Sequence, residues 1–330
     1  MSLNPEKMLE RCKSGQWNVT DFDWTKTPEI QLDKEDEMRV VQLYLNMSYI
    51  EKLAGNLFQA LRNRMEDPTL KEIYNWCYID EIRHSEAAAK LSQYFDVHQY
   101  KVYTPNLAML KFIPYFTGAV RSLNPALANS MILAGELILD IALLRGLNNY
   151  VDDPQSRAVV ERINADESRH LAMDFFMAEY CSEHNMSVHT GKKKSAFLNA
   201  DLRGMAMYGP SFFNEVFFRP MEVLDPNNKQ MESVARRLRR FNLRDEVKNN
   251  PTTKPFNNVA DMFETRMGSK LGWAIRKGIK QFTGVSFDFV LAGAKDRIGL
   301  EKGEYDATAS ATELAEEIIR EEKQQKGRAA

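Results

Sequence analysis

Hydrophobic residues recur at helical spacing through the middle of this chain, and prolines mark where the helices begin. In residues 33–66 apolar positions are interspersed with charged ones, and Gly55 is the only glycine or proline. This pattern predicts one long amphipathic helix. Asp67 and Pro68 then end it, and Pro68 suits the first turn of a second helix, which is predicted to run to about Phe95.

Two further long helices are expected after a segment broken by prolines. Residues 100–125 contain three prolines and one glycine, so this segment is predicted to cross the bundle and not to form one unbroken helix. Asn124-Pro125 is expected to cap a strongly apolar helix that runs to about Tyr150. The fourth helix is predicted to open at Asp152-Asp153-Pro154 and to end near His184.

The regions on either side of these helices have a different pattern. Residues 1–33 place aromatic side chains among polar ones without a clear helical period, which indicates an irregular arm packed on the bundle. Beyond Met186 shorter helical segments are expected, with breaks at Gly209-Pro210, Asp225-Pro226 and Asn249-Asn250-Pro251. The sequence therefore predicts an all-α protein with an N-terminal arm (1–33), a four-helix core (34–184) and a C-terminal helical extension with a charged tail (185–330).

Composition and charge exclude several classes of function. Of the 330 residues, 44% are hydrophobic and 27% are charged, as in a globular protein. The net charge of −2 gives no support for nucleic-acid binding. No run of about 18 apolar residues could span a bilayer and the N-terminus lacks the apolar stretch of a signal peptide, so we expect a cytoplasmic protein. The three scattered cysteines argue against a disulfide framework or an iron–sulfur cluster.

One string of residues occurs twice in the chain. Residues 80–84 and 166–170 both read Asp-Glu-x-Arg-His. An isolated Glu precedes each string by a similar interval, 30 residues from Glu51 to Glu81 and 31 from Glu136 to Glu167. A single Glu-x-x-His is usually an exposed ion pair or cap on a helix. Repetition of the whole unit instead indicates a shared chemical role.

The spacing within each string suits metal binding. Residues i and i+3 share one face of a helix, so the Glu and His of one string can bind the same ion. The two preceding Glu residues come from the other two helices and can complete or bridge a pair of ions. Four carboxylates and two imidazoles without thiolate suit iron or manganese better than structural zinc. The predicted ligands are Glu51, Glu81, His84, Glu136, Glu167 and His170.

Four acidic residues near these ligands are further candidates. Asp80 and Asp166 each precede the His of their own string by one turn, and we expect each to accept a hydrogen bond from its ring; the alternative is a surface charge. Asp140 follows Glu136 by one turn on an apolar helix and needs either a structural partner such as Arg or a role as proton donor during oxygen activation. Asp174 allows the same two interpretations.

Two sets of arginines have less specific roles. Arg83 and Arg169, within the two strings, can pair with the neighbouring acids or with other helices. The basic run 236–240, followed by Arg244, is interpreted either as a solvated helix face or as a docking patch for an acidic partner.

The Glu and Glu-x-x-His pattern over residues 34–184 resembles the ferritin-like di-iron carboxylate oxidases and oxygenases. These include acyl-carrier-protein desaturases, bacterial monooxygenase hydroxylases and arylamine N-oxygenases. The resemblance implies a ferritin-like four-helix bundle with additional helices, the six residues above as iron ligands, and Asp residues that hold the ligating histidines. Ile163 stands where the N-oxygenases carry an additional His, and Ala88 stands where ribonucleotide reductase subunits carry a radical-forming Tyr.

The resemblance also implies an activity. A pair of iron ions, or Fe/Mn or Mn/Mn pairs, would use dioxygen as co-substrate to hydroxylate or desaturate an organic substrate, such as an apolar acyl or aromatic compound. The chain has no flavin, nicotinamide or iron–sulfur motif, so a ferredoxin or flavin reductase is expected to deliver electrons. An acyl carrier protein as a second partner and a homodimer are both compatible with the sequence. The alternatives are a ferroxidase or iron-handling protein, and an N-oxygenase of an amine.

Overall fold

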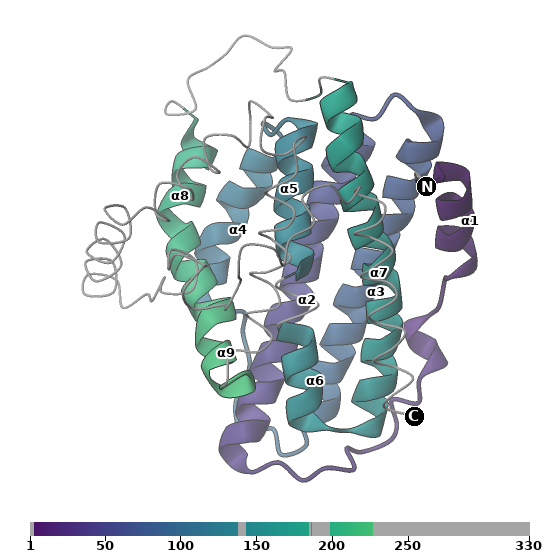
Figure 1. Ribbon diagram of the computed structural model, residues 1–330. Coiled ribbons are helices and arrows are strands. Elements are labelled where there is room, and N and C mark those ends of the chain that lie inside the picture. Colours follow the sequence, from purple (N-terminus) through teal and green to yellow (C-terminus); the bar gives the residue numbers. More distant parts are fainter. Residues whose placement is uncertain (1–2, 138–142, 185, 187–198, 227–330) are drawn as a thin grey trace, which may run out of the picture.

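The computed structural model describes residues 3–137, 143–184, 186 and 199–226. Helices and their connections make up this part of the chain, and no strand occurs in it (Figure 1). The predicted all-α class is thus confirmed for the described residues. The basic run 236–240, Arg244 and the predicted break at residues 249–251 lie outside them.

Four helices pack around a common centre. Helix α2 packs against α3 and α5, and α7 packs against α5 and α3, so the four close a ring (Figure 1). Their bounds are Lys34–Arg62 for α2, Pro68–Phe95 for α3, Pro125–Glu136 for α5 and Pro154–Glu183 for α7. The predicted bounds of α3 are confirmed at both ends, whereas α2 ends four residues before the predicted Glu66.

Three of these helices begin with the same two-residue signal. Asp67, Asn124 and Asp153 each cap a helix, accepting a hydrogen bond from the N–H three residues later at 2.9, 2.8 and 2.9 Å. The proline that follows each cap loses no hydrogen bond, because the first N–H groups of a helix have no partner within it. Each cap stabilises its helix by about 1 kcal/mol. Asp153 also accepts from the backbone N–H of Glu29 at 3.0 Å and so ties the arm to α7.

The third predicted helix is described only at its two ends. Helix α5 ends at Glu136, and α6 spans Arg145–Val151. Residues 137, 143 and 144 are π-helical, a conformation often found next to functional sites. Asp140, the candidate proton donor, lies outside the described residues.

A second pair of helices packs beside the bundle. Helix α4 (Leu107–Val120) lies within the proline-containing segment and includes Pro114, and it packs against α8 (Ala200–Phe213) and α2. The predicted break at Gly209-Pro210 is wrong, because α8 continues through both residues. Phe212 of α8 stacks on Phe112 of α4 with ring centroids 4.4 Å apart. Packing of this kind outweighs the one hydrogen bond that a proline cannot donate.

Beyond α8 the helical conformation changes before the described residues end. The chain passes through a π-helical segment, η4 (Asn214–Phe218), into α9 (Arg219–Leu224). Asp225 caps the end of α9, at the predicted break before Pro226. No helix among the described residues is long and apolar enough to cross a bilayer.

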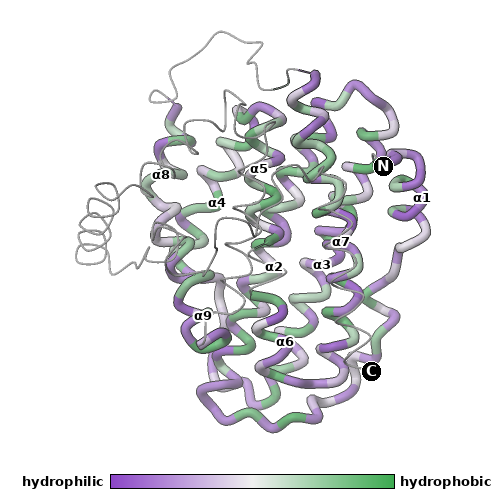
Figure 2. The backbone as a smooth tube through the Cα atoms, in the orientation of Figure 1, coloured by the Kyte–Doolittle hydropathy of each residue, from purple (hydrophilic) through white to green (hydrophobic). Residues whose placement is uncertain are grey.

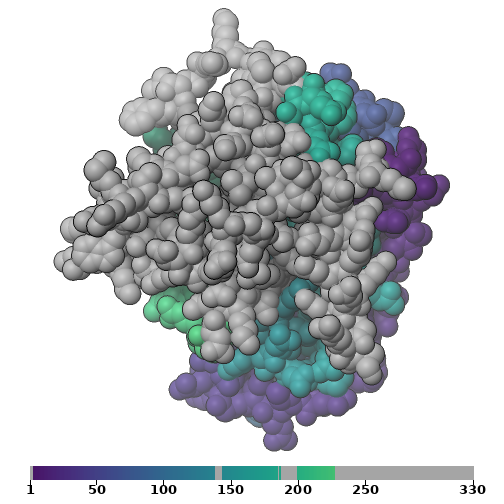
Figure 3. All heavy atoms as spheres, in the orientation of Figure 1, coloured from purple at the N-terminus to yellow at the C-terminus, as the bar shows by residue number. Residues whose placement is uncertain are grey.

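The N-terminal arm is more regular than the sequence suggested. It contains helix α1 (Pro5–Ser14) and a 3-10 turn, η1 (Val19–Asp21), so the prediction of an irregular arm is wrong for these residues. Helix α1 has ten residues and buries Met8 and Cys12, one turn apart, which is too short a pattern to show a period. It packs against α3 and α7 along one edge of the molecule (Figures 1 and 3).

The interior of the bundle is apolar at most positions but not at its centre. Along each helix the residues change between hydrophobic and hydrophilic, as expected for helices with one buried face (Figure 2). Near the middle of α2, α3 and α7 and at the end of α5, however, acidic residues and histidines are buried as completely as the leucines around them. Ionisable groups so far from water need partners that neutralise them.

Candidate metal centre

The structure brings all six predicted ligands together inside the bundle. They come from four helices, one from α2, two from α3, one from α5 and two from α7. None is more than 3% exposed. Burial of four carboxylates at one place is costly unless cations or protons neutralise them.

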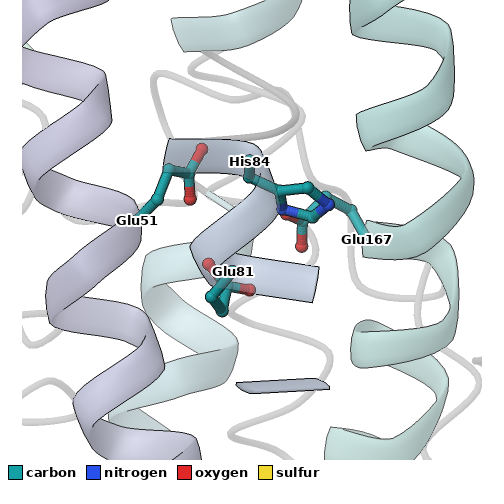
Figure 4. Close-up of side chains that lie close together, drawn as sticks. All are labelled: Glu51, Glu81, His84 and Glu167. Atoms are coloured by element: carbon teal, nitrogen blue, oxygen red, sulfur yellow. The ribbon is translucent and has the colours of Figure 1, made fainter. Parts of the chain in front are cut away.

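The ligand atoms form two overlapping groups. The first contains Glu51, Glu81, His84 and Glu167, and the second contains Glu81, Glu136, Glu167 and His170. Within each group one ligand atom from every residue lies within 4.8 Å of the others. Figure 4 shows the side chains of the first group gathered between α2, α3 and α7. Since Glu81 and Glu167 belong to both groups, the arrangement suits two neighbouring cations that share these two carboxylates.

Both histidines turn their Nδ1 atoms toward the carboxylates. His84 Nδ1 lies 2.9 Å from Glu167 Oε1, and His170 Nδ1 lies 3.1 Å from Glu81 Oε1 and from Glu167 Oε2. The sequence predicted that the Glu and His of one string can bind the same ion, and each such pair lies within one of the two groups. Contacts also cross between the helices, with His84 against Glu167 and His170 against Glu81 as well as Glu167, because α3 and α7 face each other across the centre.

The geometry around His84 Nδ1 suits two ligands of one ion. Although its Nδ1 lies 2.9 Å from a carboxylate oxygen, it makes no hydrogen bond of normal geometry. Two ligand atoms about 2.1 Å from an ion and at right angles around it are about 3.0 Å apart. Both oxygens of Glu136 are also buried without a hydrogen bond. These atoms therefore have lone pairs available for a cation.

Asp80 and Asp166 are buried beside the histidines and are not surface charges. Asp166 Oδ2 lies 3.0 Å from His84 Nε2, and Asp80 Oδ2 lies 3.4 Å from His170 Nε2. Each Asp thus faces the ring nitrogen opposite the carboxylates, as expected for a residue that orients a metal-binding His. The pairing is exchanged relative to the expectation, since each Asp contacts the His of the other string.

The arginines of the two strings connect these acids. Arg83 Nη2 bonds to Asp80 and lies 3.0 Å from Asp166 Oδ2. Arg169 Nη2 lies 2.5 Å from Asp166 Oδ1 and 3.2 Å from Asp80 Oδ2. Each arginine therefore joins α3 to α7, and the four residues, here called the Asp–Arg quartet, alternate in charge. Every charged position of the Asp-Glu-x-Arg-His string thus has a contact at or beside the centre.

Two comparisons with known proteins found no relative of this chain. No protein-family model matches the chain. A search of curated proteins finds no match either. The geometry of the residues therefore carries the functional argument.

Burial and mutual repulsion govern the charge of the cluster. Burial, followed by repulsion from neighbouring carboxylates, raises the pKa of Glu51 and Glu136 well above the usual range. Burial would also raise the pKa of Glu167, but interactions with His170 and other neighbours hold it well below its usual value. Burial alone would lower the pKa of His84, whereas its contacts with Asp166 and Glu167 raise it well above. In the absence of a metal ion these interactions favour the protonated forms of Glu51, Glu136 and His84, and a cation would compete with those protons.

Asp174 is a further buried acid, one turn beyond His170. Neither of its carboxylate oxygens has a hydrogen bond within the described part of the chain, and the hydroxyl of Tyr74 is also unpaired. Burial raises the pKa of Asp174 well above its usual value. The expected structural partner is thus not found among the described residues, and burial favours the protonated form of this carboxyl group.

Sequence analysis did not assign a role to two arm residues at this site. Gln16 Nε2 donates to Asp80 Oδ1 at 3.1 Å, and Trp17 Nε1 donates to Asp166 Oδ2 at 2.8 Å. No spacing rule relates the arm to residues so distant in sequence. The aromatic content of the arm indicated packing on the bundle, but not where.

We predict that Asp166→Asn weakens binding of Mn(II) by about ten- to a hundredfold. The amide has the same shape as the carboxylate but lacks the charge that orients His84 and pairs with both arginines. Competition with a chelating dye measures the affinity. Asp152→Asn, the same change at an exposed residue, is the control and should bind like wild type. Equal affinities in the two variants would contradict the orienting role.

Asp174→Asn should change how stability depends on pH. Because the folded protein holds the Asp174 proton more tightly than the unfolded chain, the contribution of Asp174 to wild-type stability falls as pH rises above about 4, by up to about 1.4 kcal/mol per unit. The amide variant lacks this loss, so its free energy of unfolding should rise relative to wild type with increasing pH. Urea unfolding of metal-free protein at several pH values measures the difference. A constant difference would show that Asp174 has an ordinary pKa.

Proposed function

We propose that the bundle is ferritin-like and that this protein is a dioxygen-activating, non-haem di-iron oxidoreductase. The proposal rests above all on the two overlapping ligand groups that share Glu81 and Glu167. Glu51 and His84 would complete the position of one ion, and Glu136 and His170 that of the other. The proposed reaction is hydroxylation, desaturation or another oxidation of an organic compound, and an apolar acyl or aromatic substrate is the class we favour.

The donor set favours iron or manganese over structural zinc. Oxygen atoms dominate it, two imidazole nitrogens complete it, and no thiolate belongs to either group. Such a set suits iron and manganese, while structural zinc sites usually contain thiolates and four ligands. The orphaned oxygens of Glu136 and the unbonded Nδ1 of His84 are the buried atoms that an ion would satisfy.

A bound pair of iron ions would supply the electrons and the coordination positions that dioxygen reduction requires. The residues of the chain then have separate tasks. Asp80 and Asp166 hold the two histidines in one orientation. Asp174 is a buried acid one turn from His170, and its raised pKa favours the protonated form.

Aromatic side chains exclude water around both histidines. Phe58 lies against His170 with ring centroids 4.9 Å apart, and Trp17 stacks on His84 at 6.5 Å. Both aromatic residues are buried. A dry site strengthens electrostatic interactions and protects reactive species from water, which supports oxidation chemistry at this centre.

An external electron donor is part of the proposal. The chain has no motif for a flavin, a nicotinamide or an iron–sulfur cluster, so a ferredoxin or a flavin reductase would deliver electrons. An acyl carrier protein could present an acyl substrate. The basic run 236–240 is a candidate docking patch for such acidic partners, although it lies outside the described residues.

We predict about two iron or manganese ions per chain in the purified protein, and a sharp loss of metal in Glu81→Ala and His170→Ala. Each change removes a group that the overlapping ligand sets need. Elemental analysis after metal loading and desalting measures the content. Glu86→Ala removes an exposed Glu from the same helix and should keep two ions. Full occupancy in both ligand variants would refute the assignment of the site.

Reaction with dioxygen distinguishes an oxygenase from an iron-handling protein. Reduced, iron-loaded protein should react with dioxygen, and a stopped-flow spectrometer should record a transient change in absorbance. An acyl, aromatic or amine compound that is a substrate should shorten this transient change and should be converted to an oxidised product. Iron oxidation that no compound affects would favour the ferroxidase alternative. Oxidation of an amine alone would favour an N-oxygenase. Metal binding without any reaction with dioxygen would contradict both activities.

A further inference from the structure

Three consecutive residues of the arm contact the Asp–Arg quartet. Gln16 donates to Asp80 at 3.1 Å, and its own side-chain oxygen accepts from Arg83 at 2.6 Å. Trp17 donates to Asp166 at 2.8 Å, and the Arg83 guanidinium lies 5.0 Å from the centre of its ring. Gly15 lies so close to Arg169 that an added Cβ would be 2.8 Å from Nη1.

Through these contacts a single Asp links the arm to each predicted metal-binding histidine. Asp166 accepts from Trp17 through the same oxygen that faces His84 Nε2, and the indole ring itself stacks on the His84 ring at an interplanar angle of 19°. Asp80 contacts Gln16 through Oδ1 and His170 through Oδ2. The arm therefore touches both of the acids that orient the histidines.

The arm covers the two acids of the quartet. Asp80 is 0% exposed and Asp166 is 1% exposed, although the arm lies on the outer face of α3 and α7. The covering atoms of residues 15–17 carry no charge, so they exclude water without disturbing the balance of two acids and two arginines. Without them, water would compete for the hydrogen bonds that fix the two carboxylates.

We propose that Gly15–Trp17 is a positioning segment of the metal centre, so that docking of the arm and metal binding strengthen each other. The inference rests on the proposed metal site and adds a means of regulating it. When docked, the segment holds the quartet and, through it, both histidines in the orientation that binds metal. In return, metal binding holds the histidines and the quartet in the arrangement that the arm recognises.

Thermodynamic linkage relates metal affinity to the stability of the docked arm, and both can be measured. If docking raises metal affinity by some factor, bound metal must raise the stability of the docked arm by the same factor. The arm is suited to such a role, since an isolated helix as short as α1 is marginal in water and depends on its contacts with the bundle. Segments of this kind open locally more easily than a bundle core does.

A pair of matched tryptophan variants tests the first half of the coupling. Trp17→Phe keeps a ring against His84 but removes the indole N–H, and Mn(II) affinity should fall about tenfold, within the range for groups that orient ligands. Trp24→Phe removes the same group from the same arm, where it donates to the backbone oxygen of Val19 at 2.7 Å. The Trp24→Phe variant should be less stable than wild type but should bind Mn(II) with unchanged affinity.

Hydrogen exchange of the unmodified, full-length protein tests the second half. Mn(II) should slow amide exchange of residues 15–18 by more than it slows exchange in α4, which contributes no predicted ligand and packs against α8 and α2. If Trp17→Phe fails to fold, Gln16→Ala takes its place and should also weaken Mn(II) binding. Equal Mn(II) affinity in the arm variants and Trp24→Phe, or arm exchange that Mn(II) leaves unchanged, would overturn the inference. Failure of the wild-type protein to bind Mn(II) or Fe(II) would instead refute the proposed function.

Discussion

The need to neutralise four carboxylates inside a helical bundle governs the rest of this structure. Glu51, Glu81, Glu136 and Glu167 meet where little water can reach them, and each raises the cost of charging its neighbours. Two histidines offset part of this repulsion, and protons or cations must offset the remainder. The four carboxylates require charged partners nearby, so acids, histidines and Arg83 are buried together inside a bundle that is otherwise built largely from leucines, alanines and aromatic residues.

The Asp–Arg quartet lies beside the two histidines and links α3 to α7. In the Asp–Arg quartet each arginine contacts an acid on its own helix and one on the opposite helix, so the quartet favours one register of α3 relative to α7. Ion pairs this deeply buried often contribute little net stability, but loss of one member leaves an unpaired charge. Their value here lies in geometry, since they fix the oxygens that face His84 and His170.

Local signals in the sequence predicted much of the fold and the membership of the site. Asp67-Pro68 located the start of α3, and the spacing of Glu and His placed the candidate ligands on common helix faces. The sequence did not predict which residues of neighbouring helices contact one another. The exchanged pairing of Asp80 and Asp166 depends on how α3 faces α7, and the continuation of α8 through Pro210 depends on aromatic packing with α4. Neither is encoded in the spacing of residues along one helix.

The exchanged contacts mean that neither Asp-Glu-x-Arg-His string contains a complete half of the proposed centre. His84 faces Asp166 and lies against Glu167, while His170 faces Asp80 and lies against Glu81 as well as against Glu167 of its own string. In the proposed centre the first cation to enter would arrange Glu81 and Glu167 for the second. The two positions would then fill cooperatively, and a protein carrying a single ion would be a minor species at every stage of a titration.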